Sequence, residues 1–383
     1  MRKICIVIGS RANYSSIKSA MREIRDHDEL QLQVVVSASA VLDRYGAVSD
    51  LIREDGFEPD ASIYSLIEGE TPATMAKSTA LGLMELPTVF ERLQPDIVLT
   101  VGDRFETMAT TLAAVYMNIR LAHTMGGEVT GTVDESIRHA ITKFAHIHFP
   151  ACSDARERII KLGELPEYVY EVGCPRMDLV AEILTQNKQD LDQSLFSDGV
   201  GGEFDLAKPF LLLSQHPVTT EYGQGEDQIN ASLEAIETLG MPAIALWPNA
   251  DAGSEEISRG MRKYRESHPG SKIHFFKNLP IATYVRLMQN TACLIGNSSS
   301  GIREGAFIGT PAVNVGSRQN SRQRGRNIID TECRRDDIVD AVRRHLQHGH
   351  YESEPIYGDG RAGRKIAEIL ATSTPPVQKT IAY

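Results

Sequence analysis

The chain has 383 residues, a net charge of −11 and a hydrophobic content of 42%. This length exceeds one typical core, so we expect two domains. The acidic balance argues against a nucleic-acid partner, because a protein that binds the phosphate backbone needs a basic face. No apolar run reaches the length of about 18 residues that a membrane span needs. Five scattered cysteines indicate reduced thiols of a cytoplasmic protein, and neither C-x-x-C nor H-E-x-x-H occurs to signal a metal site.

The first half of the chain alternates short apolar runs with helical patterns. The predicted strands are 4–8, 32–36, 96–101, 119–123, 147–149 and 169–172. The helical patterns include 16–24, 74–93, 105–117 and 136–145. This alternation is typical of a parallel sheet built from βαβ units.

A weakly patterned region, 186–208, interrupts the series before it resumes. The later predicted strands are 210–213, 243–246, 272–276, 293–295 and 312–315, and the helices between them include 228–239 and 255–266. We therefore predict an N-terminal α/β domain over 1–185 and a second one over 186–359. A last helix, within 360–375, is expected to pack back on the first domain, and the tail 373–383 is expected to be loose. Ligands should bind at the carboxyl ends of the strands, in one cleft.

Polar residues follow the strands of the first predicted domain. Arg11, Asp103 and Glu128 each come just after a predicted strand, and Asp134 opens the next helical pattern. Carboxylates from neighbouring strand ends would converge and raise one another's pKa, which suits acid–base work. Plainer roles fit the same residues when each is taken alone: Asp103 or Asp134 as a helix N-cap, and Arg11 or Glu128 in solvent.

The second predicted domain contains a candidate phosphate site. The sequence GNSSSGIRE at 296–304 lies between a strand and a helix, where hydroxyls and backbone N–H groups meet the positive end of the helix dipole. His216 and Arg318 each follow a predicted strand, and both could contact an anion. Glu304 lies near this anchor and suits ribose hydroxyls, which suggests a nucleotide. A serine N-cap on an ordinary helix is the plainer interpretation.

These stretches together resemble the hydrolysing UDP-N-acetylglucosamine 2-epimerases of sialic-acid biosynthesis, in the bacterial form and in the epimerase half of the animal bifunctional epimerase/kinase. The resemblance covers nearly the whole chain in order, through GSRANYS at 9–15, VGDRFE at 101–106, GGEVTGTVDESIRHAITK at 126–143, QHPVTT at 215–220, PNADAGS at 248–254, GNSSSGIRE at 296–304 and GTPAVNVGSRQ at 309–319. It implies a GT-B-like α/β fold, with two doubly wound Rossmann-like domains and a cleft between them.

The resemblance also implies roles for individual residues. Asp103, Glu128 and Asp134 would be the catalytic carboxylates, and His216 would act beside the leaving diphosphate. The residues that would contact UDP are Arg11, Ser15, Arg104, His216, Asn249, Ser298, Ser299, Glu304 and Arg318. No cofactor and no metal are implied. The expected partners are a UDP-sugar substrate and further copies of the chain, in a dimer or tetramer.

The implied reaction removes the C2 proton of UDP-N-acetylglucosamine, eliminates UDP to leave a glycal, and adds water to give N-acetylmannosamine. The GDR and IRHAITK patterns favour this hydrolysing branch over a non-hydrolysing epimerase, which would add UDP back to the glycal. The same reaction on UDP-2,4-diacetamido-2,4,6-trideoxyglucose, for legionaminic acid, stays open. So do a GT-B glycosyltransferase and a nucleotide-sugar sensor without activity.

Overall fold

The computed structural model describes residues 1–42, 48–68, 71–129, 133–186, 191–218, 221–248, 253–277 and 279–382, apart from the side chains of residues 72 and 133. The chain divides into two compact units. Unit 1 contains Met1–Val129, Val133–Leu179 and Tyr357–Tyr383, and unit 2 is formed mainly by Val180–Ile356. The end of the chain therefore belongs to the same unit as its beginning.

Unit 1 is built on a six-stranded parallel sheet with the order β3-β2-β1-β4-β5-β6. Its strands are β1 (Arg2–Ile8), β2 (Leu30–Ser37), β3 (Ala61–Ile63), β4 (Ile97–Val101), β5 (Arg120–Thr124) and β6 (Ile147–Phe149). The strand order reverses between β1 and β4. In a doubly wound sheet, ligands bind outside the carboxyl ends of the strands at such a switch point.

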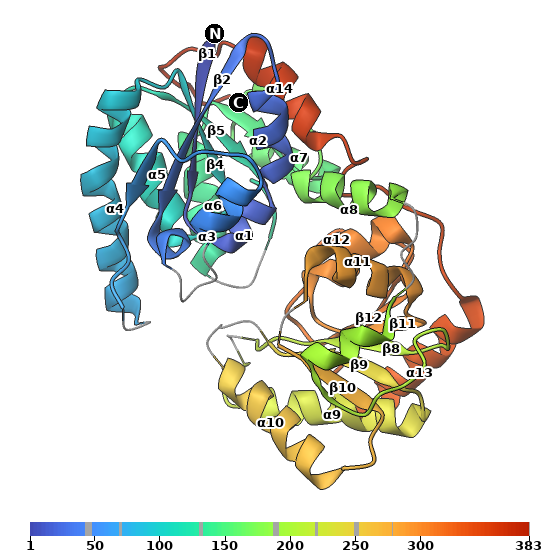
Figure 1. Ribbon diagram of the computed structural model, residues 1–383. Coiled ribbons are helices and arrows are strands. Elements are labelled where there is room, and N and C mark those ends of the chain that lie inside the picture. The colour runs from blue at the N-terminus through green and yellow to red at the C-terminus, as the bar shows by residue number, and fades with distance from the viewer. Residues whose placement is uncertain are drawn as a thin grey trace. The chain divides into compact units, whose positions relative to one another are not determined.

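Helices cover both faces of this sheet. They are α1 (Arg11–Ser15), α2 (Lys18–Arg25), α3 (Val48–Glu54), α4 (Pro72–Leu93), α5 (Phe105–Tyr116), α6 (Val133–Phe144), α7 (Ser153–Lys161), α8 (Pro175–Thr185, which runs on into unit 2) and α14 (Ala362–Thr372). The odd and even residues of β1 belong to two different cores, because side chains alternate along a strand. Ile4 and Ile6 pack with α2 and α14, whereas Cys5 and Val7 pack with α4 and α5. Figure 1 shows these two pairs of helices on opposite faces of the sheet.

Unit 2 repeats the plan with a seven-stranded sheet of order β13-β12-β11-β8-β9-β10-β7, in which only β7 is antiparallel to its neighbour. The strands are β7 (Val200–Gly201), β8 (Leu211–Ser214), β9 (Ala243–Leu246), β10 (Ile273–Phe276), β11 (Cys293–Gly296), β12 (Ala312–Val315) and β13 (Ile328–Thr331). The helices are α9 (Gly225–Leu239), α10 (Ser254–Ser267), α11 (Ile281–Asn290), α12 (Ser299–Ile308) and α13 (Arg335–His348).

One predicted strand, 169–172, is wrong. Val169 forms a single bridge with His148, and the Tyr170 N–H donates to the His148 carbonyl at 2.9 Å. The next parallel bond would need an N–H from Pro150, which proline lacks. The Val172 N–H still donates to the Pro150 carbonyl at 3.3 Å, but no second bridge forms, so a single bridge stands where a strand was predicted. The short strands β3, β7 and β13 were not predicted.

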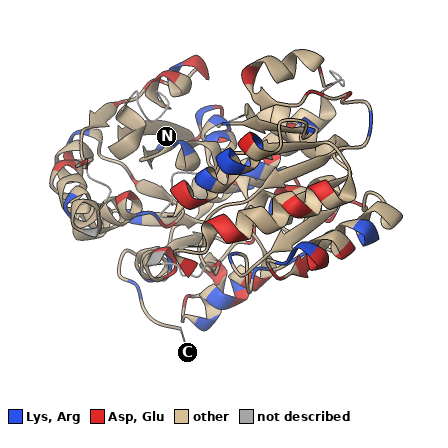
Figure 2. Ribbon diagram, turned by 90° about the horizontal axis from the view of Figure 1, so that it is seen from below, with Lys and Arg blue, Asp and Glu red and all other residues tan. Residues whose placement is uncertain are grey.

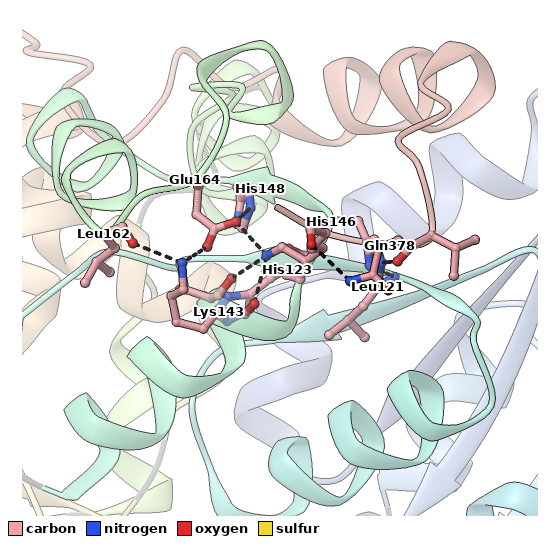
Figure 3. Close-up of polar contacts among 12 residues, drawn as sticks. Leu121, His123, Lys143, His146, His148, Leu162, Glu164 and Gln378 are labelled. Carbon is pink, nitrogen blue, oxygen red and sulfur yellow. Dashed lines mark hydrogen bonds and ion pairs between the residues drawn. The ribbon is translucent and has the colours of Figure 1, made fainter. Parts of the chain in front are cut away.

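The expectation of a loose tail is also wrong for the described residues 373–382. The Lys379 ammonium donates to the Lys143 carbonyl at 2.8 Å and to Glu164 Oε2 at 2.6 Å. His146 Nε2 bonds the Val377 carbonyl at 2.9 Å, and the Ala382 N–H donates to the Gly163 carbonyl at 2.9 Å. Figure 3 shows Lys143 and His148 pointing toward Glu164. Because Lys379 of the tail bonds the same carboxylate, the tail completes this polar cluster inside unit 1.

Acidic and basic residues are interspersed along the helices (Figure 2). Within the described ranges, no helix is both long and apolar enough to cross a membrane. All five cysteines lie in these ranges; none forms a disulfide, and four of them are buried.

Candidate functional site

The carboxyl edge of the unit 1 sheet carries two of the predicted carboxylates, Asp103 and Glu128, directly after sharp turns. Gly102, with φ of +74°, turns the chain after β4 and is followed by Asp103. After β5, Met125 and Gly127 have φ of +59° and +75°, and Glu128 follows. Glycine suits two of these three left-handed positions, Gly102 and Gly127, since it has no Cβ to clash. Both turns therefore expose short polar loops at adjacent strand ends.

Arg138 of α6 joins these two loops. Its Nη2 is paired with Asp103 Oδ2, and its Nη1 donates to the Glu128 carbonyl at 2.6 Å. The Arg138 side chain is 4% exposed, and that of Asp103 is 23% exposed. A buried guanidinium holds its partners in a fixed plane, so this residue sets the relative position of Asp103 and the Glu128 loop. Asp103 is thus an ion-pair partner and not a helix cap, because Arg104 occupies the N-cap of α5.

His123 of β5 supports the turn after β4, a role that was not predicted. Its Nε2 bonds the Gly102 carbonyl at 2.8 Å, and the ring is fully buried. Burial lowers the His123 pKa to about 3, so the ring is neutral and donates through Nε2–H. This bond holds Gly102, the left-handed residue directly before Asp103, in place. Sequence alone gave only a histidine within an apolar strand.

Asn13 hydrogen-bonds to the ends of both β1 and β4. The Gly9 N–H donates to Asn13 Oδ1 at 3.2 Å, and Asn13 Nδ2 donates to the Val101 carbonyl at 3.1 Å. Ser10 caps α1 by accepting from the Asn13 N–H. Arg11 is exposed at the first position of this helix. Ser15 is the last residue of α1 and therefore lies at the end of the helix away from the strand edge. Its hydroxyl accepts a 3.4 Å bond from Arg176.

Two more residues of the first domain's candidate set lie at this edge. Arg104 Nε donates to Glu106 Oε1 at 2.8 Å, and the Arg104 side chain is 46% exposed. Asp134 is half-buried in the first turn of α6. Burial raises the Glu106 pKa, Arg104 opposes this, and the charge of Asp134 adds to it. Glu106 was not predicted as a site residue, although it lies inside the sequence VGDRFE.

In unit 2, Asn297 joins the predicted anion-binding residues. The His216 N–H donates to Asn297 Oδ1 at 2.7 Å, and Asn297 Nδ2 donates to the His216 carbonyl at 2.8 Å. Arg318 Nη1 donates to the Asn297 carbonyl at 3.3 Å. The loops after β8, β11 and β12 therefore share one buried asparagine, 1% exposed. Sequence reasoning missed this role, for which the only signal was an amide side chain at a strand end.

His216 is buried at 7% exposure. Burial and the charge of Arg318 lower its pKa to about 3. The ring is therefore neutral, and its contribution to an anion site is an N–H donor rather than a positive charge. Arg318 carries the positive charge of this edge.

Helix α12 begins as the plainer interpretation expected. Ser298 is its N-cap, and its Oγ accepts from the Ser300 N–H at 3.3 Å. Ser299 is the first helical residue, and Ser300 Oγ bonds the Tyr284 hydroxyl at 2.7 Å. Glu304 lies one turn further on and is 4% exposed. Asn249, the remaining predicted UDP contact, lies outside the described residues.

The described ranges contain no cluster of His, Cys, Asp and Glu that could hold a metal ion. Unit 1 thus brings Asp103, Glu128 and Arg138 together, with Arg104, Glu106 and Asp134 at the same edge. Unit 2 brings together His216, Arg318 and the start of α12.

Comparison with known proteins identifies the family. Residues 22–371 match the family model for UDP-N-acetylglucosamine 2-epimerase. The chain belongs to this family. A Legionella pneumophila relative, UDP-N,N'-diacetylbacillosamine 2-epimerase (hydrolyzing), is 33% identical over 372 residues, covering 97% of this chain and 96% of the relative.

A second relative supports this placement, and a solved structure supports the fold. The Campylobacter jejuni GDP/UDP-N,N'-diacetylbacillosamine 2-epimerase (hydrolyzing) is 32% identical over 335 residues, covering 86% of this chain and 84% of the relative. The crystal structure of UDP-GlcNAc 2-epimerase from Neisseria meningitidis bound to UDP-GlcNAc aligns with a TM-score of 0.79 at 17% identity, covering 97% of this chain and 100% of that chain. The predicted GT-B-like fold, with two doubly wound α/β domains, is confirmed.

Proposed function

We propose that the chain is a hydrolysing 2-epimerase that acts on a UDP-activated 2-acetamido sugar. Family membership supports epimerase chemistry, and the names of the Legionella and Campylobacter relatives support the hydrolysing type. The structural observation that carries the proposal is the buried guanidinium of Arg138, which holds Asp103 and the Glu128 loop together. Carboxylates fixed at the carboxyl edge of a parallel sheet suit proton transfer at a bound sugar.

In this mechanism a carboxylate takes the proton from C2. The C2–H electron pair becomes the C1=C2 double bond, and the C1–O pair leaves with UDP. Because the C2 proton is weakly acidic, cleavage of the C1–O bond runs ahead of proton removal. Water then adds its hydroxyl to C1, while a proton returns to C2 on the opposite face. The products are the 2-epimeric free sugar and UDP.

We assign proton transfer to Asp103, Glu128 and Asp134. Asp103 lies at a fixed position and keeps partial access to solvent. Glu128 is 5% exposed, and Asp134 lies in the first turn of α6. Two carboxylates on opposite sides of C2 would divide the base and acid roles, since the proton leaves one face and returns to the other.

Most of the UDP contacts are assigned to residues of unit 2. Arg318 would stabilise the charge that develops on the leaving diphosphate, and neutral His216 would donate an N–H to it. The positive end of α12, at Ser298 and Ser299, would add its dipole. Glu304 would accept from ribose hydroxyls. Arg11, Ser15, Arg104 and Asn249 complete the proposed UDP contacts.

Two substrates are in question. UDP-N-acetylglucosamine, giving N-acetylmannosamine, is supported by the family model and by the name of a Neisseria meningitidis relative with 28% identity. UDP-2,4-diacetamido-2,4,6-trideoxyglucose is supported by the Legionella and Campylobacter relatives, at 33% and 32% identity, whose names specify a diacetamido sugar. The two sugars differ at C4 and C6.

An NMR product assay in deuterated water, with each sugar in turn, tests the proposal. We expect one sugar to give free 2-epimer and UDP in equal amounts, with deuterium at C2. UDP-sugar epimers without free sugar would indicate the non-hydrolysing reaction. Transfer of the sugar to an added acceptor would indicate a glycosyltransferase, and UDP binding without turnover of either sugar would indicate a sensor.

A further inference from the structure

Glu106 is a buried acid that the proposed mechanism does not use. It lies in the first turn of α5, directly beyond the end of β4, and its side chain is 6% exposed. Its Oε1 accepts from Arg104 Nε, and within the described part of the chain its Oε2 has no hydrogen-bond partner. Burying a carboxylate costs several kcal/mol, whereas an ion pair with a half-exposed partner returns roughly 0–1 kcal/mol. The fold alone therefore gives little reason for an acid at this position.

The end of β1 leaves room for this acid. A Cβ atom at Gly9 would lie 2.2 Å from Glu106 Cγ and 3.1 Å from its Cβ, which no packed structure allows. The φ of Gly9 is not positive, so its backbone does not require glycine. Gly9 is thus glycine because Glu106 packs directly over it. The position of Glu106 is set by two adjacent strand ends of the sheet.

Arg104 is the group that gains from this arrangement. A free arginine side chain has several rotatable bonds, and ordering it costs up to about 2 kcal/mol. The bond to Glu106 occupies Nε and fixes the plane of the guanidinium before any ligand arrives. An arginine can offer its two terminal nitrogens together to a pair of phosphate oxygens. Preorganisation of this kind strengthens binding by removing an ordering cost.

We propose that Glu106 is a positioning residue, which holds the Arg104 guanidinium at the carboxyl edge of the unit 1 sheet so that it binds a phosphate of the substrate. This inference rests on the proposed function, in which Arg104 contacts UDP. Burial raises the Glu106 pKa, and the Arg104 charge opposes part of that rise. Glu106 acts through Arg104 and does not itself touch the substrate.

A double-mutant cycle on UDP affinity, measured by calorimetry, tests the proposal. We expect Arg104→Ala to weaken UDP binding about 10- to 100-fold, as a charge-assisted contact would. Glu106→Ala should weaken it about 5- to 10-fold in the wild-type background and less than about twofold in the Arg104→Ala background. Glu106→Gln keeps an oxygen that accepts from Nε and should restore affinity to within about threefold.

Glu164→Gln is the matched control, because it also removes a buried, ion-paired carboxylate of unit 1 and should leave UDP affinity unchanged. If Glu106→Ala does not fold, Gly9→Ala displaces the same side chain and should show the same dependence on Arg104. Equal effects of the Glu106 change in both backgrounds, or none in either, would overturn the positioning role. An Arg104→Ala protein with normal UDP affinity would instead remove Arg104 from the proposed function, and this inference with it.

Discussion

The polar cluster around Glu164 gives a stability prediction that can be worked out from the structure. The Glu164 side chain is 3% exposed and is bonded by Lys143 and Lys379 at 2.6 Å and by His148 at 3.1 Å. Burial alone would raise the Glu164 pKa, but the bonds from His148, Lys143 and Lys379 outweigh it and lower the pKa from 4.5 to about 2. Burial also lowers the pKa of His148, so at neutral pH a neutral ring donates to the carboxylate.

Glu164→Gln removes the charge and keeps the shape. A pKa lowered to about 2 corresponds to roughly 3 kcal/mol of stability at neutral pH. Lys143 is 37% exposed, so solvent screens part of this, and we expect a loss of roughly 2 kcal/mol. Because the folded-state pKa lies below the unfolded one, this stability is present above about pH 4.5 and is lost as the pH falls toward 2. The difference between the two proteins should therefore shrink by roughly a third to a half at about pH 3.5.

Urea denaturation followed by far-UV circular dichroism measures this loss. The chain has one tryptophan, Trp247, which lies in unit 2, so its fluorescence follows the other unit in the same samples. Glu157→Gln is the control, because its ion pair with Lys161 is exposed and should contribute less than about 0.5 kcal/mol. A Glu164→Gln protein as stable as this control at about pH 7, or a difference that does not depend on pH, would refute the reasoning.

Three further predictions concern the candidate site. Asp103→Asn and Glu128→Gln should each lower turnover about 100-fold or more and leave UDP affinity within a few-fold in calorimetry; near-normal turnover in both would remove the carboxylate assignment. Arg138→Lys should lower kcat about 10- to 100-fold at nearly unchanged UDP affinity, because an ammonium lacks the planar fork that reaches Asp103 and the Glu128 carbonyl together; a loss of affinity with kcat intact would contradict this. Arg318→Ala should weaken UDP binding by about 1.5–3 kcal/mol, and an unchanged titration would count against the proposed anion site.

The central strands were readable from the sequence because strands buried on both faces appear as continuous apolar runs. The strand β1 is an example, since its Ile4 and Cys5 enter different cores. The strand β3 has only three residues, and the burial pattern of β13 contains no fully buried position. Such short or half-exposed strands do not appear in the sequence as a clear run of apolar residues. The prediction at 169–172 failed for a different reason: the missing donor belongs to Pro150 of the neighbouring segment.

Long-range polar contacts were beyond sequence reasoning. Lys379 bonds the carbonyl of Lys143 and the carboxylate of Glu164, both far away along the chain. No local pattern marks a lysine for burial, and terminal residues are loose by default. The strand-end residues were easier to predict, because every parallel strand delivers its next residue to the same edge. Asn297, which orients the strand-end residues of unit 2, was recognised for that role only from the geometry.

The start of α12 shows how the two interpretations of 296–304 combine. The N–H groups of Asn297 and Ser298 both donate to the Ser214 carbonyl at 3.2 Å, and the Ser300 N–H donates to Ser298 Oγ. These amides already have partners within the chain, so the helix start offers fewer donors to a phosphate than the sequence suggested. The bond to Ser298 Oγ is long, at 3.3 Å, and a cap of this kind contributes only about 1 kcal/mol, so a phosphate oxygen could replace it. Among the unit 2 residues assigned to the diphosphate, Arg318 must then bring the positive charge, because neutral His216 brings only a hydrogen bond.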